Sequence, residues 1–173
     1  MEDDLFILFF VLIIWLILYV ILEFNIINKK RIEVKRVFLE LDDIFQKRIN
    51  ILAKIVDIVK AYDKNQFDDL GSRLYDYSKV YNDIDYNQKV EINNALEADI
   101  KKLLLVSKVY PELKDVPKFI KFEKQIIRYS KVIRKLKIKY NKVLDNYNNR
   151  KKVFPSGLIC FICKFYNYDY FKL

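Results

Sequence analysis

Two cysteines, Cys160 and Cys163, have the type and spacing that most directly suggest chemistry in this chain. A C-x-x-C step can supply half of a zinc site or form a redox-active pair. The chain has no histidine and no further cysteine to complete four zinc ligands, and no predicted strand precedes the pair as in a thioredoxin-like unit. In the cytoplasm both thiols should be reduced. We therefore expect no metal site and no cofactor, and we treat both side chains as apolar.

Two Tyr-Asn steps, Tyr140-Asn141 and Tyr147-Asn148, are a second group of interest. Their phenols and amides could form a polar site inside a helical bundle. The simpler interpretation is that the rings fill a core, while the hydroxyls and amides satisfy backbone groups at helix ends or reach water. The sequence shows no nucleophile-base pair, glycine-rich phosphate loop or metal cluster. We therefore predict that the protein is not an enzyme.

A row of cations at helical spacing, called the basic row below, is the third group. From Lys121 onward these residues occupy the helix face opposite the aromatic positions, so we expect them on the outer surface. Such a row can meet anionic lipid headgroups or an acidic protein, and phosphate contacts to nucleic acid need only such cations. The alternative is a solvated face that keeps the protein soluble. The basic row consists of Lys114, Lys118, Lys121, Lys124, Arg128, Lys131, Lys135 and Lys142.

The charged residues of the whole chain are also unevenly distributed. Residues 1–113 hold 16 basic and 19 acidic side chains, whereas residues 114–173 hold 16 basic and 4 acidic ones. The last third of the chain therefore carries +12 and the rest −3, which gives the formal net charge of +9. A concentration of positive charge of this kind favours an acidic partner.

The cations and the Tyr-Asn steps must be positioned by one long amphipathic helix, predicted from Phe119 to Pro155. Its apolar residues recur at steps of three and four, and a seven-residue rhythm runs through the Tyr-Asn steps to Phe154-Pro155. Aromatic rings repeated on one face require partner helices that bury them. The apolar positions are Phe119, Phe122, Ile126, Tyr129, Ile133, Leu136, Tyr140, Val143 and Tyr147.

Three upstream helices are predicted to supply these partners. Apolar spacing gives helices over residues 26–62, 67–81 and 88–110, separated by polar breaks at residues 63–66 and 82–87. Pro111 should end the third helix, and Asp115 should cap the long helix that follows. Only two glycines and three prolines in 173 residues agree with an all-helical chain.

An uncharged apolar run, Leu5–Leu22, precedes these helices and includes Trp15 and Tyr19. Eighteen helical residues span about 27 Å, close to the roughly 30 Å hydrocarbon core of a bilayer. A signal peptide would need a basic start and a small-residue cleavage site, whereas this run follows Glu2-Asp3-Asp4. Basic residues follow the run at positions 29–36, which predicts an external N-terminus and a cytoplasmic remainder.

The complete prediction is an all-α protein with a single N-terminal transmembrane helix and a cytoplasmic antiparallel four-helix bundle, whose first and last helices are long. Its three parts are the anchor (1–25), the bundle (26–157) and an aromatic basic C-terminal tail (158–173). For the tail, two placements stay open. The rings can lie at the level of the lipid headgroups, or the tail can fold back and cap the membrane-proximal end of the bundle.

Several motifs resemble the C-terminal signature of the LemA family of bacterial membrane proteins. They are Tyr110-Pro111 with Phe119, the two Tyr-Asn steps, and Phe154-Pro155, and the resemblance covers nearly the whole chain, including the anchor. It implies a short external N-terminus, one transmembrane helix and a cytoplasmic helical bundle, and it implies no reaction. The chain departs from the family at some polar positions. Lys137, for example, stands where arginine is usual.

The functional hypothesis is a membrane-anchored interaction or scaffold protein of the bacterial cytoplasmic membrane. Its partners would be the bilayer itself and, through the basic row, anionic lipid headgroups or an acidic protein, with self-association as a further option. The alternative hypothesis is a membrane-tethered nucleic-acid-binding protein that uses the same row, although the anchor makes nucleic acid the less favoured partner.

Overall fold

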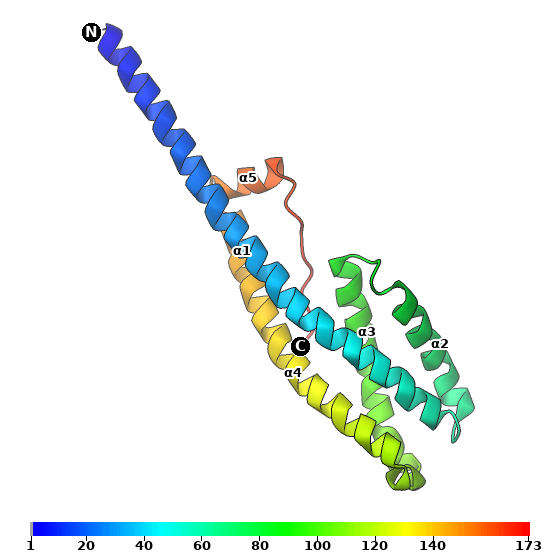
Figure 1. Cartoon of the computed structure of the whole chain (residues 1–173). Coiled ribbons are helices and arrows are strands. Elements are labelled where there is room, and N and C mark those ends of the chain that lie inside the picture. Colours follow the sequence, from blue (N-terminus) through cyan, green and yellow to red (C-terminus); the bar gives the residue numbers. More distant parts are fainter. Residues whose placement is uncertain (1) are drawn as a thin grey trace. The chain divides into compact units, whose positions relative to one another are not determined.

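The computed structural model describes the backbone of residues 2–173 and the side chains of residues 4–63 and 67–173. Met1, the first residue of the predicted anchor, lies outside the described residues, as do the side chains of Glu2 and Asp3. All regular structure in the described part of the chain is helical, so the predicted all-α class is confirmed. Figure 1 shows α1 (Glu2–Val59), α2 (Lys64–Val80), α3 (Tyr86–Val109), the 3-10 helix η1 (Pro111–Asp115), α4 (Pro117–Lys151) and α5 (Ser156–Ile162).

The first three α-helices follow the predicted pattern with small shifts at their ends. α1 joins the apolar run to the predicted helix 26–62 without a break, and it ends three residues early, at Val59. α2 begins at Lys64, inside the predicted polar break. α3 begins two residues before the predicted Gln88 because Asp85 and Gln88 form a capping box. The Asp85 carboxylate accepts from the backbone N–H of Gln88, and the Gln88 side chain accepts from that of Asp85.

The long helix α4 corrects two predictions. It begins at Pro117, and its first backbone bond runs from Ile120 N–H to the carbonyl of Val116, so the predicted cap Asp115 belongs instead to η1. The helix also ends at Lys151 rather than Pro155. Pro155 has no N–H to continue the ladder, and it disfavours helical geometry at the residue before it. The last turn accordingly tightens to bonds between residues three apart, with Val153 N–H donating to the Arg150 carbonyl.

This early end removes Phe154 from the apolar face of α4. Phe154 is 75% exposed, so the prediction that it continues the buried aromatic positions is wrong. Pro155 itself is buried, and the chain then forms α5, a short helix that the prediction did not include.

The chain forms two compact units. Unit 1 comprises residues 1–36 and 142–167, and unit 2 comprises residues 37–141 and 168–173. α1 and α4 each contribute one part to each unit. The predicted division at residues 25 and 157 refers to membrane insertion and stays a prediction.

Unit 2 contains an aromatic core. The Phe38 ring lies 4.5 Å from Tyr86 and 5.9 Å from Tyr140, measured between ring centroids. Phe171 lies 5.0 Å from Tyr140 and 5.4 Å from Phe45. Along α1, the apolar residues that recur at steps of three and four are all buried, from Val34 in unit 1 to Val59 in unit 2, namely Val34, Phe38, Leu41, Phe45, Ile49, Leu52, Val56 and Val59.

The apolar run differs from every other apolar segment of α1. Among the described residues, α1 is the one helix that is long and apolar enough to cross a membrane, with a mean hydropathy of 3.3 in an 18-residue window. None of this window is buried within the protein. Leu5 is 69% and Trp15 66% exposed, whereas the core helix of a soluble protein would be covered.

Candidate functional site

The basic row lies where its spacing predicts. Lys114 belongs to η1 and the other seven residues to α4, and all eight side chains are exposed. The opposite face of α4 is buried, including Phe119, Ile126, Ile133 and Tyr140. The row is therefore free of intramolecular packing and available as a surface, while its partner stays a prediction.

Residues of the Tyr-Asn steps form hydrogen bonds with the C-terminal part of the chain. Tyr140 and Tyr147 are fully buried, and the Tyr147 hydroxyl donates to the Tyr166 carbonyl over 3.2 Å. The Asn141 amide donates to the Phe171 carbonyl over 2.8 Å and accepts from the Phe171 N–H over 3.1 Å. As predicted, these polar groups satisfy the backbone, but the backbone in question is an extended C-terminal segment rather than a helix end.

The remaining motif residues lie apart from this contact. Tyr110 closes α3 and donates from its hydroxyl to Asp63 over 3.0 Å, which links the end of α3 to the turn after α1. Pro111 is exposed at the start of η1. Five of the nine motif residues, from Tyr110 to Asn141, belong to unit 2, and the other four, from Tyr147 to Pro155, belong to unit 1. They do not form one reactive site.

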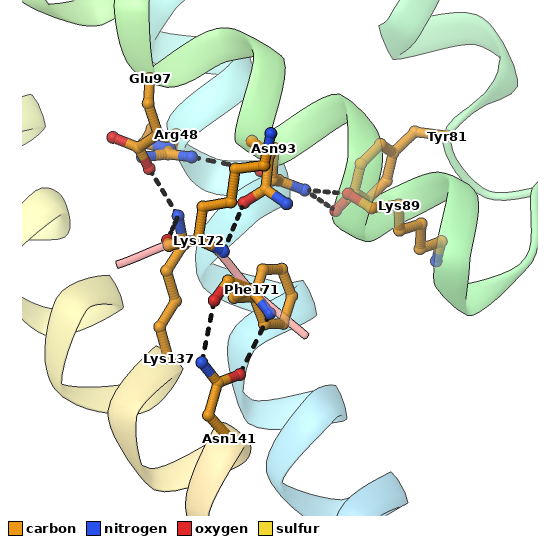
Figure 2. Close-up of polar contacts among 10 residues, drawn as sticks. Arg48, Tyr81, Lys89, Asn93, Glu97, Lys137, Asn141, Phe171 and Lys172 are labelled. Carbon is orange, nitrogen blue, oxygen red and sulfur yellow. Dashed lines mark hydrogen bonds and ion pairs between the residues drawn. The ribbon is translucent and has the colours of Figure 1, made fainter. Parts of the chain in front are cut away.

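A buried charge cluster in unit 2 was not predicted. The Arg48 guanidinium, whose side chain is 0% exposed, bonds to Glu97 Oε1 over 3.1 Å and to Asn93 Oδ1 over 3.2 Å. Lys137 Nζ approaches the same Glu97 oxygen to 2.8 Å. These four residues, called the charge cluster below, connect α1, α3 and α4, as Figure 2 shows.

Asn93 connects the cluster to Tyr81, which follows α2, and to Lys89, near the start of α3. Its amide donates to the Tyr81 hydroxyl over 2.9 Å and to the Lys89 carbonyl over 2.8 Å. Lys89 in turn pairs with Asp42 over 3.0 Å. Burial raises the pKa of Tyr81, so its phenol stays neutral and serves only as a hydrogen-bonding group.

The charge cluster contains two cations, Arg48 and Lys137, and one carboxylate, Glu97. Burial by itself would raise the pKa of Glu97, but Arg48 and Lys137 outweigh it and hold that pKa below its ordinary value of 4.5. Burial lowers the pKa of Lys137, against the opposing effect of Glu97. One carboxylate therefore compensates two cations that have little access to water, and each ion depends on the others.

The last six residues, Tyr168–Leu173, are called the end segment below and complete unit 2. Figure 2 shows Phe171 and Lys172 between Asn141, Lys137 and Asn93. The Lys172 carbonyl lies 3.4 Å from Lys137 Nζ, and its N–H donates to Asn94 Oδ1 over 3.1 Å. The Asp169 N–H donates to Asn87 Oδ1 over 3.0 Å. Side chains of α3 and α4 therefore bind the main chain of the end segment.

Changing Asn141 to alanine tests this recognition of the main chain. The loss of both hydrogen bonds to Phe171 should lower the free energy of unfolding of unit 2 by about 1–2 kcal/mol. Hydrogen exchange should also show faster exchange of the Phe171 amide proton. The matched control is Asn146→Ala, an exposed asparagine of the same helix. Unchanged protection of the Phe171 amide in the Asn141 variant would contradict the assignment.

The C-x-x-C step is asymmetric. Cys160 is buried and Cys163 exposed, and both are free thiols. Burial raises the pKa of Cys160, which keeps its thiol protonated and a poor metal ligand at neutral pH. Within the part of the chain whose side chains are described, no group of three His, Cys, Asp or Glu residues is arranged to hold a metal ion.

The sequence carried a local signal for two of the missed residues. Lys137 lies four residues after Ile133 and three before Tyr140, so a cation occupies a position on the buried face of α4. Arg48 lies three residues after Phe45 and four before Leu52, on the buried face of α1. A charged residue at an apolar-face position indicates a buried partner of opposite charge. Periodicity does not identify that partner, which is Glu97 on another helix.

Comparison with known proteins identifies the family. Neither the curated proteins nor the solved structures contain a match to the chain. The model of the LemA family matches residues 38–173, which include the charge cluster, the Tyr-Asn steps and the end segment. The apolar run lies outside this matched range, so its assignment depends on its own composition and exposure. Because the match covers most of its length, the chain belongs to the LemA family.

Proposed function

We propose that this protein is a single-pass, membrane-anchored interaction protein of the bacterial cytoplasmic membrane, with its N-terminus outside and its helical units in the cytoplasm. The exposed apolar run carries the proposal. Eighteen uncharged residues with no protein cover would be unfavourable in water, whereas a bilayer covers a helix of this length. The basic residues that follow support the cytoplasmic placement of the rest.

In this proposal, unit 2 is an antiparallel four-helix bundle that displays the basic row as far as Lys135, and Lys142 follows in unit 1. Ion pairs between different segments support a rigid unit: Arg48 of α1 with Glu97 of α3, Arg73 of α2 with Asp99 of α3, and Lys60, in the turn after α1, with Asp68 of α2. The end segment closes the core of the same unit. Rigid display of exposed cations suits recognition of acidic surfaces, and the proposal involves no catalytic step.

The test uses the full chain reconstituted in nanodiscs of neutral lipid, a step that also requires the apolar run to insert. Binding to anionic vesicles, neutral vesicles, acidic protein and nucleic acid is measured at low and high salt. A row variant carries Lys121, Lys124, Arg128, Lys131 and Lys135 changed to glutamine. Because a surface lysine contributes about 1 kcal/mol near an anionic membrane, we expect at least about 100-fold weaker binding to the acidic partner.

A matched variant controls for net charge. It carries five exposed lysines outside the row changed to glutamine, namely Lys54, Lys79, Lys101, Lys102 and Lys108. Loss of binding in the row variant but not in the matched variant supports display through the row. Equal binding by both variants contradicts it. Steeply salt-dependent binding to nucleic acid, without a response to vesicles or acidic protein, would replace the proposal with the nucleic-acid tether.

A further inference from the structure

The segment around α5 exposes an unusual amount of apolar surface. Phe154 is 75%, Leu158 52%, Phe161 82% and Ile162 68% exposed. These four residues, called the α5 face below, recur at steps of four, three and one, so those within α5 share one side of the helix. The other side, with Ser156, Ile159 and Cys160, is buried.

Three of the aromatic residues further along the tail are buried, whereas Tyr166 is 38% and Tyr170 44% exposed. Phe165 is 9%, Tyr168 5% and Phe171 2% exposed. Of the two placements left open for the tail, the one at the lipid headgroups therefore remains for α5, not for the end segment. The end segment folds into unit 2, while the α5 face has no cover in the described part of the protein.

Contacts within unit 1 fix the level of α5 along α1. The Ser156 hydroxyl, at the start of α5, donates to Glu23 Oε2 over 2.8 Å, and Arg150 pairs with the other oxygen. Glu23 is the residue directly after Leu22, where the apolar run ends. Phe165, shortly after α5, packs on α1 as well, with Arg31 lying 4.4 Å above its ring. α5 therefore lies beside α1 at the end of the apolar run (Figure 1).

The charge around α5 suits an anionic surface. Residues 150–164 contain four basic side chains and no acidic one. Lys152 and Lys164, on either side of α5, are exposed, and so is Lys29 on α1. Apolar side chains flanked by lysines are typical of helices that lie in a membrane interface.

From the exposed face, its level on α1 and these charges, we propose that α5 lies in the headgroup region of the cytoplasmic leaflet and inserts Phe154, Leu158, Phe161 and Ile162 between lipids. This inference depends on the proposed membrane anchor and adds a second lipid contact to it. The Glu23 contacts with Ser156 and Arg150 then have a clear role. They neutralise a carboxylate at the edge of the hydrocarbon core and hold the start of α5 at that level.

The test uses the full chain with Cys160 changed to alanine, so that a single native thiol remains. Cys163, exposed at the end of α5, is labelled with an environment-sensitive fluorophore. The protein is reconstituted in vesicles with spin-labelled lipids that quench either at the headgroup or deep in the acyl chains. We expect quenching at the headgroup to exceed deep quenching. It should also exceed, several-fold, the quenching of a label at Val109→Cys, an exposed position of unit 2, in a background without Cys160 and Cys163.

A triple variant with Leu158, Phe161 and Ile162 changed to glutamine should lose the quenching at Cys163. A matched variant with Leu105, Val109 and Ile127 changed to glutamine should keep it, since these exposed apolar residues lie in unit 2. Retention of quenching by the triple variant would overturn the proposal. So would protection of the label that depends on protein concentration rather than on lipid, because a second copy would then cover α5.

The fluorescence of Trp15 distinguishes an error in the placement of α5 from an error in the proposed anchor. It is the only tryptophan of the chain and lies within the apolar run. Brominated acyl chains should quench its fluorescence in wild type and in the triple variant alike. Quenched Trp15 with an unquenched Cys163 label refutes the placement of α5 alone. An unquenched Trp15 refutes the anchor, and the placement of α5 with it.

Discussion

Replacing Glu97 with glutamine should destabilise unit 2 by about 2–4 kcal/mol. The substitution keeps the shape of the side chain but leaves Arg48 and Lys137 without the carboxylate that both contact. Removal of one partner from a fully buried ion pair costs about 3–5 kcal/mol. The expected loss is somewhat smaller, because the Glu97 side chain is 35% exposed and water screens part of the repulsion.

Thermal unfolding of the full chain in mild detergent, followed by circular dichroism, measures this change. The control is Glu91→Gln, an exposed carboxylate six residues earlier on α3, which should leave the transition unchanged. A triple variant with Arg48→Met, Glu97→Leu and Lys137→Met removes all three charges together. It should recover most of the lost stability, since apolar residues of similar size can replace a buried ion cluster. A triple variant as unstable as the single one would show that packing, rather than unpaired charge, causes the loss.

The same carboxylate predicts a dependence on pH. The pKa of Glu97 is lowered in the folded protein, so the unfolded chain binds the proton more readily. Its contribution to stability is fully present above the ordinary value of 4.5 and is lost as the pH falls through the lowered value. The difference between wild type and Glu97→Gln should therefore be constant near neutral pH and shrink at acidic pH, where the carboxyl is protonated and resembles the amide.

Phe171→Ala should lower the free energy of unfolding of unit 2 by about 3–4 kcal/mol. Phe171 is 2% exposed and packs against Phe45 of α1 and Tyr140 of α4, so truncation leaves a cavity among rings that are held by two helices and cannot easily collapse. The end segment should also detach, because its hydrogen bonds to Asn141 and Lys137 depend on the ring being seated.

Phe161→Ala provides the matched comparison. The same substitution ten residues earlier removes a ring that is 82% exposed, so stability in detergent should change by no more than about 0.5 kcal/mol. Limited proteolysis checks the second consequence, since only the Phe171 variant should be cleaved readily near residues 164–168. Equal stability of both variants would contradict the placement of the end segment in the core.

The helices were predictable because their signals are local. The steps of three and four on α1 identified its buried residues from Val34 to Val59, and the same spacing identified the buried face of α4. The end of α4 was predicted too late, because a seven-residue rhythm was followed through Phe154 although Pro155 interrupts the hydrogen-bond ladder first. The start of α3 was also predictable from a local signal, because Asp85 and Gln88 have the spacing of a capping box.

The charge cluster and the end segment could not be predicted from such signals. Glu97 meets Arg48 and Lys137 through the packing of three helices, and no spacing along the chain identifies which carboxylate faces a given cation. The end segment is extended and has no periodicity that indicates a buried side. Its aromatic composition fits a lipid interface as well as a protein core, and only the burial and contacts of Phe171 place it in the core.

The way in which the end segment is bound has a consequence for how its sequence can evolve. Asn87, Asn94, Asn141 and Lys137 all contact main-chain atoms, which every amino acid except proline supplies. Selection through these contacts therefore acts on the path of the segment rather than on its side chains. Exposed positions such as Asp169 and Lys172 are free to drift, whereas the buried rings of Tyr168 and Phe171 are constrained. Related sequences should therefore keep two aromatic residues three positions apart in this segment, while its other residues vary.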